Sequence, residues 1–388
     1  MLVLSACFAP LGYQSGDTTL SVNLGSEGTM ARSGIVKENF LYKLSFSGPG
    51  GRTITENARW GQTVTIRVVP GRWLIEVEAT LNGELYARGI STENVGTGRN
   101  NSVAIQMGFA RIEAIGPFLA EAPGGTLENP VNLHLAMQLN NENWEGIFTA
   151  LNDAGKYVNL YLSACTRSNS NTGGGLRSDG TLDDPYAILG TGRIYVVSLT
   201  LPEAADSIVD GHIISPFDHL SNLKHVSTGN GLKTIGKYAF AGDMGLMTIT
   251  SVTFGNSVET IGEYAFSGSQ LTTIMLPDSL ITIGEWAFYG TLLTGHLVIP
   301  DSVITIKESA FYLNQLTSVT IGNGVVTIEY DAFSSFWGIT SVTFKRSGVP
   351  FIDSGFMGNL ISVYATHGAG IYTRPTVSDP TWTYIGLP

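Results

Sequence analysis

The sequence predicts a mainly β protein, with an N-terminal β-sandwich, a bridging β-α-β cap and a C-terminal solenoid with a parallel sheet. Two observations carry the prediction. The first is composition, because only 14% of the 388 residues are charged while glycine occurs 47 times, a balance typical of short strands joined by tight turns. The second is a repeat: an Ala-Phe pair returns every 22 to 26 residues through the C-terminal half. A chain of this length also indicates two or three domains.

The N-terminus contains the run Leu4-Ser5-Ala6-Cys7. This run resembles the bacterial lipobox, in which small residues precede a cysteine that becomes lipidated. The resemblance implies a lipid anchor at Cys7 and a tether over residues 1–16. Only six residues precede Cys7, without the basic stretch and long apolar core of a complete signal, so we expect a start codon placed too late or a trimmed leader. The alternative is an ordinary apolar N-terminus with a chance cysteine.

Residues 17–109 are predicted to form the β-sandwich, of immunoglobulin-like or transthyretin-like type. Short segments of alternating apolar and polar residues are separated by turn signals, and Asn82-Gly83 is typical of a type I′ hairpin turn. Pro70-Gly71 is expected to turn the chain and to direct Trp73 into the core. Modules of this kind usually serve as spacers. The expected strands include Thr18–Leu24, Leu41–Phe46, Val64–Val68, Trp73–Ala79, Glu84–Ala87 and Ser102–Met107.

Residues 110–190 are predicted to bridge the two larger parts as a β-α-β unit that covers the open end of the solenoid. Strands are expected over Val131–Met137 and Tyr157–Leu162. Between them, apolar residues at helical spacing predict a helix that Asn143 caps and Gly155 ends.

Residues 191–365 contain the repeat, and residues 366–388 are expected to cap its C-terminal end. Between the Ala-Phe pairs the pattern L-x-x-L-x-L recurs, and a Thr-Ile pair precedes each Ala-Phe. A period in the low twenties with this pattern is typical of leucine-rich repeats. Because no single coil can bury its own apolar face, the coils are expected to stack around one shared core. The pairs are Ala239-Phe240, Ala265-Phe266, Ala287-Phe288, Ala310-Phe311 and Ala332-Phe333, with Gly355-Phe356 as a degenerate copy.

The stretch Leu316–Phe333, which reads LTSVTIGNGVVTIEYDAF, resembles the BspA-type (treponemal) leucine-rich repeat of bacterial surface proteins. With the lipobox, the β-sandwich and the Tyr372–Pro375 tail, most of the chain resembles a family of spirochaete surface lipoproteins. Many family members have a cysteine three positions after the Phe of Ala-Phe. The absence of that cysteine leaves the fold prediction intact and removes a thiol-based role. Its positions are taken here by Asp243, Ser269, Thr291, Asn314 and Phe336.

The resemblance implies an adhesin-like function. It describes a protein of the bacterial cell surface, lipid-anchored in the outer membrane or secreted, that binds an extracellular protein or glycan of a host or of other bacteria. A second hypothesis is a structural or immune-decoy surface protein without a specific ligand. A third is a carbohydrate-active enzyme, which needs two carboxylates across one cleft. The sequence shows no such pairing, so we expect a protein that is not an enzyme.

The remaining residue patterns exclude several kinds of chemistry. A net charge of −11 without a Lys or Arg run disfavours nucleic acid as a partner. No nucleotide-binding, metalloprotease or hydrolase motif occurs, and the six histidines are scattered, so we expect no cofactor and no metal site. Cys165 is expected to be a buried thiol. Gly229-Asn230-Gly231 and Gly322-Asn323-Gly324 are expected to be turns. The periodic carboxylates are expected on a solvated face: Glu259, Glu263, Asp278, Glu285, Asp301 and Glu308.

The outward side of the parallel sheet is the candidate binding face, because the x positions of L-x-x-L-x-L form a ladder of hydroxyls on a surface where solenoids often bind. The alternative is that threonine simply suits a strand. Tyr364 and Trp337 are expected to add contact area, unless Trp337 belongs to the core. The candidate residues are Thr250, Ser251, Thr253, Thr272, Thr273, Met275, Thr317, Ser318, Thr320, Thr340, Ser341 and Thr343.

Overall fold

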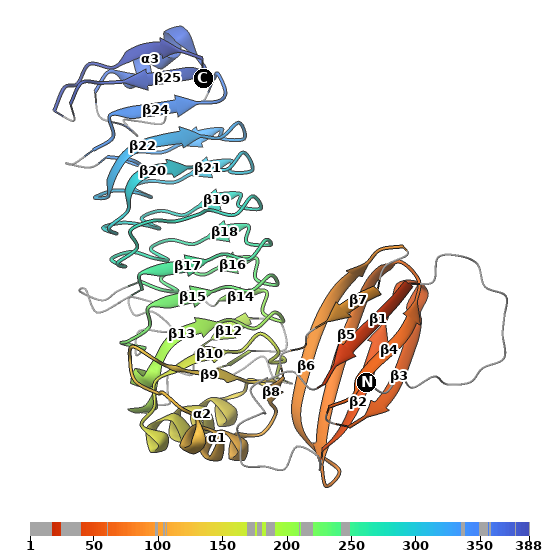
Figure 1. Cartoon of the computed structure of the whole chain (residues 1–388). Helices are drawn as coiled ribbons and strands as arrows, with labels where there is room; N and C mark the ends of the chain where they lie inside the picture. Colours follow the sequence, from red (N-terminus) through yellow and green to blue (C-terminus); the bar gives the residue numbers. More distant parts are fainter. Residues whose placement is uncertain are drawn as a thin grey trace. The chain divides into compact units, whose positions relative to one another are not determined.

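The computed structural model describes most of the chain in two compact units (Figure 1). One unit takes in the described residues up to Gln138 together with Asp153–Thr166. The other takes in Leu139–Asn152 and the described residues from Arg167 onward, so the predicted bridging segment contributes to both. Cys7 lies outside the described residues. These are residues 18–24, 40–59, 61–97, 100–103, 105, 107–168, 175–176, 181–183, 191–208, 210, 220–241, 249–334, 338–348, 356, 358–376 and 378–387.

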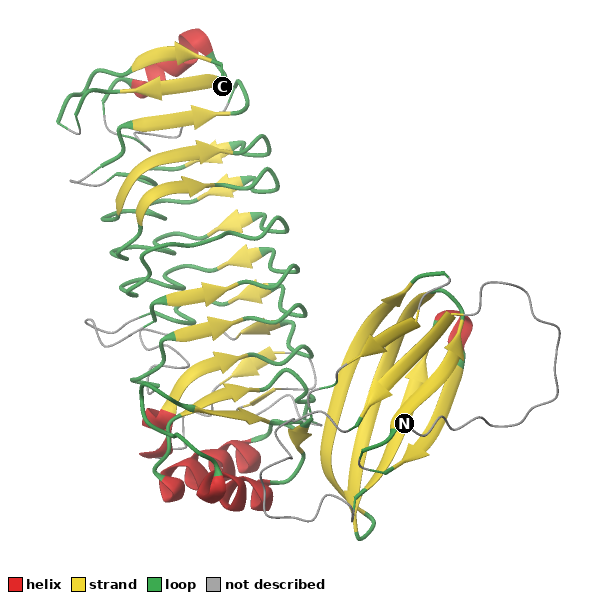
Figure 2. Cartoon of the chain, in the orientation of Figure 1, coloured by secondary structure: helices red, strands yellow, loops and turns green. Residues whose placement is uncertain are grey.

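The N-terminal strands form two sheets that share one hydrophobic core (Figure 2). The three-stranded sheet has the order β4-β1-β7, and the five-stranded sheet has the order β3-β2-β5-β6-β8. This pairing of sheets agrees with the expected strands, while the immunoglobulin-like or transthyretin-like type stays a prediction. The elements are β1 (Thr18–Asn23), β2 (Leu41–Ser47), η3 (Pro49–Gly51), β3 (Thr53–Ala58), β4 (Thr63–Val68), β5 (Gly71–Leu81), β6 (Glu84–Val95), β7 (Asn100–Val103) and β8 (Gly108–Phe109).

Two local predictions in this region are confirmed. Asn82 and Gly83 join β5 to β6 with φ of 53° and 85°, and positive values at both positions are what a type I′ turn requires. Trp73 is completely buried, and its indole N–H donates to the carbonyl oxygen of Val69 at 2.9 Å. A buried indole that is hydrogen-bonded in this way contributes apolar area without leaving a polar group unsatisfied.

The bridging segment contains a β-α-β unit, in which β9 and β10 pair in parallel. The predicted helix is present, but the prediction that Asn143 caps it is wrong. The helix begins earlier, and the side-chain oxygen of Asn140 accepts the backbone N–H of Asn143 at 2.9 Å, which is the N-cap geometry. Gly155, at φ 59°, follows the end of the helix as predicted. The elements are η4 (Ile112–Ala114), α1 (Ile115–Glu121), β9 (Val131–His134), α2 (Asn141–Ala154) and β10 (Val158–Tyr161).

His134 makes the stability of this region sensitive to acid. Its ring stacks on Tyr161 with centroids 4.2 Å apart, and burial lowers the pKa of His134 to about 4 from an ordinary value of 6.5. As the pH falls below 6.5, the unfolded chain binds a proton that the folded chain binds only near pH 4. The free energy of unfolding should therefore fall by roughly 3 kcal/mol across that window.

The test compares urea unfolding of the wild type with that of His134→Phe, which keeps a stacking ring but cannot titrate. The variant should lose less stability between pH 7 and pH 4 than the wild type. His225→Gln, a change at an exposed histidine, should behave as the wild type does. Equal acid sensitivity in all three proteins would contradict the prediction.

The solenoid has two ladders of strands on its two sides (Figures 1 and 2). Each Thr-Ile pair is a two-residue strand that pairs in parallel with the equivalent pair of the next coil, with the isoleucine buried. The L-x-x-L-x-L segments form the other ladder. The first ladder comprises β11 (Gly175–Leu176), β12 (Thr181–Asp183), β14 (Ser207–Ile208), β16 (Thr234–Ile235), β18 (Thr260–Ile261), β19 (Thr282–Ile283), β21 (Thr305–Ile306) and β23 (Thr327–Ile328).

The L-x-x-L-x-L ladder is parallel, as predicted, and it is interrupted at one coil. Residues 271–276 form no strand, and the next copy has a bulge between Gly295 and His296. The extra residue of that copy disrupts the ladder locally, and Pro277 has no N–H to donate. The strands before the break are β13 (Val196–Thr200), β15 (His225–Ser227) and β17 (Ser251–Thr253), and those after it are β20 (Thr294–Val298), β22 (Gln315–Ile321) and β24 (Ser341–Phe344).

The phenylalanines of the Ala-Phe pairs form the core of the solenoid, as predicted. Phe240, Phe266, Phe288, Phe311 and Phe333 are buried, and each ring stacks on the next with centroids 5.1 to 5.4 Å apart. The degenerate copy continues the column, because the Phe356 ring lies 4.8 Å from that of Phe333. One continuous aromatic column therefore runs through successive coils.

The turns between coils approach each other closely. A Cβ on Gly255 would lie 1.5 Å from the carbonyl oxygen of Gly229 in the preceding coil. No residue with a side chain fits there without a backbone shift, which agrees with the interpretation of the Gly-Asn-Gly segments as turns.

Both ends of the solenoid pack against further elements. At the start, η5 (Thr191–Tyr195) places the Arg193 guanidinium carbon 5.0 Å from the centroid of the Phe148 ring of α2. At the end, β24 pairs antiparallel with β25 (Gly370–Thr373), which pairs with β26 (Thr383–Gly386) beside α3 (Leu360–His367). The antiparallel strands close the parallel ladder.

Candidate functional site

The candidate face is the outward surface of the L-x-x-L-x-L ladder. Every one of its predicted residues is at least partly exposed, while the alternating Val252, Ile274, Val319 and Val342 lie on the inner side with less exposure. The structure therefore brings the predicted residues together on one side of the solenoid. The coil in which residues 271–276 form no strand contributes Thr272, Thr273 and Met275 to this face.

Strand pairing arranges the face in rows. One row aligns Ser198, His225 and Ser251, and continues after the break with His296, Ser318 and Ser341. The parallel row aligns Thr200, Ser227 and Thr253, and continues with Val298, Thr320 and Thr343. Of these described residues none is acidic and none is a lysine or arginine. In a chain with a net charge of −11, these two central rows form an uncharged strip.

A third row of threonines supports the stacking of the coils. The hydroxyl of Thr250 donates to the carbonyl oxygen of Lys224 at 3.2 Å, and that of Thr317 donates to Gly295 at 3.2 Å. The hydroxyl of Thr340 makes a longer contact of the same kind with Thr317, at 3.4 Å. These hydroxyls are occupied within the solenoid, so they contribute to stability more than to a ligand site.

Hydroxyls in the central rows are available to a ligand. Within the described part of the chain, the side chains of Ser251, Thr253, Thr273 and Thr343 form no hydrogen bond. The same rows carry two exposed apolar side chains, Met275 at 88% exposure and Val298 at 49%. The face thus combines an apolar centre with unoccupied hydroxyls, which is the mixture that a macromolecular interface uses.

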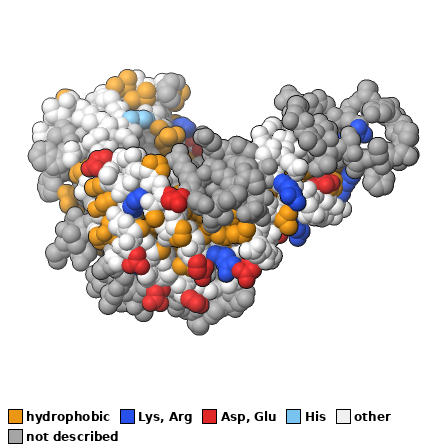
Figure 3. Space-filling view, turned by 60° about the horizontal axis from the view of Figure 1, so that its bottom comes forward, with side chains coloured by type: hydrophobic (Ala, Val, Ile, Leu, Met, Phe, Trp, Pro, Cys, Tyr) orange, Lys and Arg blue, Asp and Glu red, His pale blue; other side chains and the backbone are white. Residues whose placement is uncertain are grey.

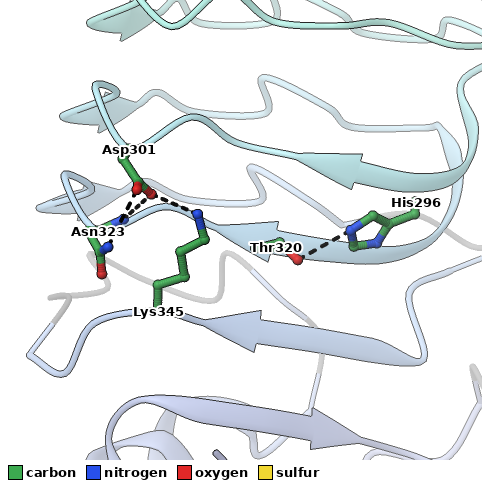
Figure 4. A network of polar contacts seen from close by, with 5 residues as sticks. All are labelled: His296, Asp301, Thr320, Asn323 and Lys345. Carbon is green, nitrogen blue, oxygen red and sulfur yellow. Dashed lines mark hydrogen bonds and ion pairs between the residues drawn. The ribbon is translucent and has the colours of Figure 1, made fainter. Parts of the chain in front are cut away.

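His296 is a member of this face that the sequence analysis missed. Its Nδ1 lies 2.8 Å from the hydroxyl of Ser318, and its Nε2 lies 3.2 Å from that of Thr320 (Figure 4). One ring nitrogen of a neutral imidazole donates and the other accepts, so both contacts are satisfied together. The sequence held one signal for this role of His296. The residue occupies an outward position in the L-x-x-L-x-L copy that has one extra residue.

Two charged residues, Asp301 and Lys345, lie at the rim of the face, where the strands have ended. The carboxylate of Asp301 accepts the backbone N–H of Asn323 at 2.9 Å and pairs with the Lys345 ammonium at 3.0 Å (Figure 4). The Asn323 N–H, followed by Lys345, holds the pKa of Asp301 below its ordinary value. The carboxylate of Asp301 therefore links successive turns of the solenoid.

Tyr364 does not contribute to the face, and this prediction is wrong. Its side chain is buried and its hydroxyl donates to the carbonyl oxygen of Arg346 at 2.6 Å. The ring lies 4.3 Å from that of Phe344, because α3 packs over the last coil and turns this residue inward. Trp337 lies outside the described residues.

The other sequence-predicted groups are placed as follows. Cys165 is buried as predicted, and burial raises the pKa of its thiol to about 12. No group of three or more His, Cys, Asp or Glu side chains among the described residues has the geometry to hold a metal ion. None of the helices in the described part of the chain is long and apolar enough to cross a membrane.

Comparison with known families identifies the repeat. Residues 196–250 and 244–361 match the family model described as BspA type leucine rich repeat region, in six copies. The solenoid is therefore built from BspA-type leucine-rich repeats, which confirms the resemblance of the repeat and the fold class. Repeats of this kind generally serve interactions with other proteins, often in surface or secreted proteins. No curated protein matches the chain.

Proposed function

We propose that this protein is an adhesin-like protein of a bacterial surface, and that it binds a host or bacterial macromolecule through the outward face of its solenoid. The observation that carries the proposal is the uncharged strip, which joins free hydroxyls to the apolar pair Met275 and Val298. The lipid anchor at Cys7 and the role of the N-terminal strands as a spacer rest on the lipobox and on the strand pattern of the sequence.

The arrangement of charge supports a protein-binding surface. Interface cores are depleted in charged residues and surrounded by a polar rim. Here the two central rows are uncharged, and two charged groups at the strand ends, Asp301 and Lys345, pair with each other. A partner that covers the strip therefore removes no unpaired charge from water, which keeps the desolvation cost low.

The test places charge in the centre of the strip. In the full chain, the double variant Met275→Glu/Val298→Glu should bind immobilised extracellular-matrix protein at least tenfold more weakly than the wild type, measured by surface plasmon resonance. Burying two unpaired carboxylates costs several kcal/mol, and about 1.4 kcal/mol corresponds to each tenfold loss. Both positions are exposed, so the variant should keep the thermal stability of the wild type.

The matched control is Leu41→Glu/Val69→Glu, which exchanges two exposed apolar residues of the N-terminal unit for the same charges. It should bind as the wild type does. Equal binding by wild type and by the solenoid variant would favour the structural or immune-decoy hypothesis instead.

A further inference from the structure

The opposite side of the solenoid has a different surface, which we call the Thr-Ile side. It is defined by the residues that flank the Thr-Ile ladder from Lys237 to Val326. Ile281, Ile304 and Val326 precede their Thr-Ile pairs and are 38%, 47% and 41% exposed. The N–H of Ile304 donates to the carbonyl of Ile281, and that of Val326 to Ile304, so the three form an aliphatic column on successive coils. Three large exposed aliphatic side chains in contiguous coils indicate a surface that a partner covers.

Aromatic side chains lie in the turns that directly follow the Thr-Ile pairs. The rings of Tyr238, Tyr264 and Trp286 are partly exposed and stack with centroids 4.8 and 5.8 Å apart. Tyr289 and Tyr312 stack on each other and meet Trp286 edge-on. Tyrosine and tryptophan are the residues most enriched where protein interfaces gain their energy.

Carboxylates accompany the aromatic column. Backbone hydrogen bonds align Glu285 with Tyr264 and Glu308 with Trp286, which places glutamates at equivalent positions of neighbouring coils. Glu285 also accepts the indole N–H of Trp286 at 2.9 Å. Both glutamates lie in the turns that follow the Thr-Ile strands. Like charges on neighbouring coils repel, so this column favours a cation beside it.

The chain itself supplies such a cation at one end of the column. The Lys237 ammonium lies 2.6 Å from a carboxylate oxygen of Glu263 and 5.2 Å from the centroid of the Tyr238 ring. No ion pair reaches Glu285 or Glu308 from the described residues, although Lys307 precedes Glu308 in the sequence. In the following coils, Glu285 beside Tyr264 and Glu308 beside Trp286 repeat the pairing of a carboxylate with an aromatic ring. Neither pair has a counterpart of the Lys237 ammonium in the described part of the chain.

We propose that the Thr-Ile side binds a basic, amphipathic polypeptide segment of a partner protein. Its Lys or Arg side chains meet Glu285 and Glu308 as Lys237 meets Glu263, and its apolar side chains cover the aliphatic column. Figure 3 draws one face of the molecule, with the lower end of Figure 1 turned forward, and hydrophobic side chains lie there among acidic ones. This surface is separate from the uncharged strip of the proposed function, and neither depends on the other.

A sugar is a poorer fit to this surface than a peptide. Rings that stack with interplanar angles of 4° and 5° cover each other's faces and present mainly edges to solvent. A pyranose ring packs on an open aromatic face, whereas aliphatic and cationic side chains pack on edges and carboxylates. The geometry thus favours a polypeptide occupant.

The experiment measures binding of a fluorescein-labelled octapeptide of alternating lysine and leucine to the full chain by fluorescence polarisation. Glu285→Gln/Glu308→Gln should weaken binding about five- to tenfold, as expected for two lost ion pairs at a partly exposed surface. Gln keeps the acceptor for the Trp286 indole, so folding is preserved. Lys237→Gln should strengthen binding severalfold, because it uncovers Glu263 and Tyr238 for the peptide.

The control is Glu121→Gln/Glu128→Gln, which removes the same charge from exposed positions of the N-terminal unit and should leave binding unchanged. A peptide of alternating serine and leucine should bind more weakly than the lysine peptide. Equal weakening by the two double variants would show general electrostatic attraction and overturn the proposal, as would tighter binding of a neutral oligosaccharide than of the lysine peptide. The variants Met275→Glu/Val298→Glu should bind the lysine peptide no more weakly than the wild type, which separates this surface from the uncharged strip.

Discussion

Replacing Phe288 by alanine is expected to lower the free energy of unfolding of the solenoid by about 3 to 5 kcal/mol, the range for truncating a buried aromatic side chain. Phe288 is completely buried, and its ring stacks on Phe266 at 5.4 Å and on Phe311 at 5.1 Å. A cavity at this position removes contacts on both sides, because each coil is stabilised through its neighbours. The effect should therefore exceed that of removing a phenylalanine at the end of the column.

Urea unfolding followed by circular dichroism checks this prediction. The chain has two compact units, so the transition of the solenoid has to be resolved from that of the N-terminal unit before a free energy is assigned. Tyr330→Ala is the control, since this aromatic residue of the neighbouring region is 46% exposed and should cost less than about 1 kcal/mol. Comparable losses for the two variants would contradict the role of the Phe column.

Replacing Asn314 by leucine is expected to cost about 2 to 4 kcal/mol, although leucine is apolar and similar in size. The amide of Asn314 is buried and donates to the carbonyl oxygens of Phe288 and Phe311 at 2.8 and 3.0 Å. Its oxygen also accepts the hydroxyl of Thr291. Leucine removes the amide donor from both carbonyl oxygens, and only the Phe288 carbonyl keeps another contact, with the Thr291 hydroxyl at 3.3 Å. Each unsatisfied buried group costs about 1 to 3 kcal/mol.

The position of Asn314 is the one where the resembled family often has cysteine, which provides an internal comparison. Asn314→Cys should lose less stability than Asn314→Leu, because a thiol can still donate a weak hydrogen bond to a carbonyl oxygen, whereas leucine cannot donate one. Asn323→Ala, at an exposed turn, should stay within about 0.5 kcal/mol of the wild type. If the leucine variant matched the cysteine variant in urea unfolding, the carbonyl-bonding role of Asn314 would be wrong.

How well the sequence predicted the structure differs from one element to the next. The hairpin turn at Asn82-Gly83 and the buried Trp73 were predictable because local chemistry decides them. The cap of α2 was assigned to Asn143 rather than Asn140, since several asparagines compete for one role and only the helix start selects among them. Tyr364 was expected at the surface, but the packing of α3 over Phe344 buries it.

The candidate face was predictable as a set of positions but not as a site. Period and alternation place Thr250 and Thr253 on the same outward side. Only the coil-to-coil contacts show that the hydroxyl of Thr250 donates to the carbonyl oxygen of Lys224, while that of Thr253 has no hydrogen bond among the described residues. In the same way, the histidines look scattered along the chain, and the register alone brings His296 beside Ser318 and Thr320.

Periodicity and residue type were enough to establish the stacked coils, the Phe core and the outward rows, because a coil of some twenty residues that cannot bury its apolar side alone has to share it with the next. The Thr-Ile side depended on the folded chain. Tyr238, Tyr264 and Trp286 have φ near 55°, a left-handed conformation that disfavours bulky residues by roughly 1 to 2 kcal/mol. The equivalent Ser309 and Asp331 share that conformation at φ 52° and 51° without an aromatic ring. The repeated backbone path of the stacked coils therefore imposes it, and no local preference of the side chain predicts it.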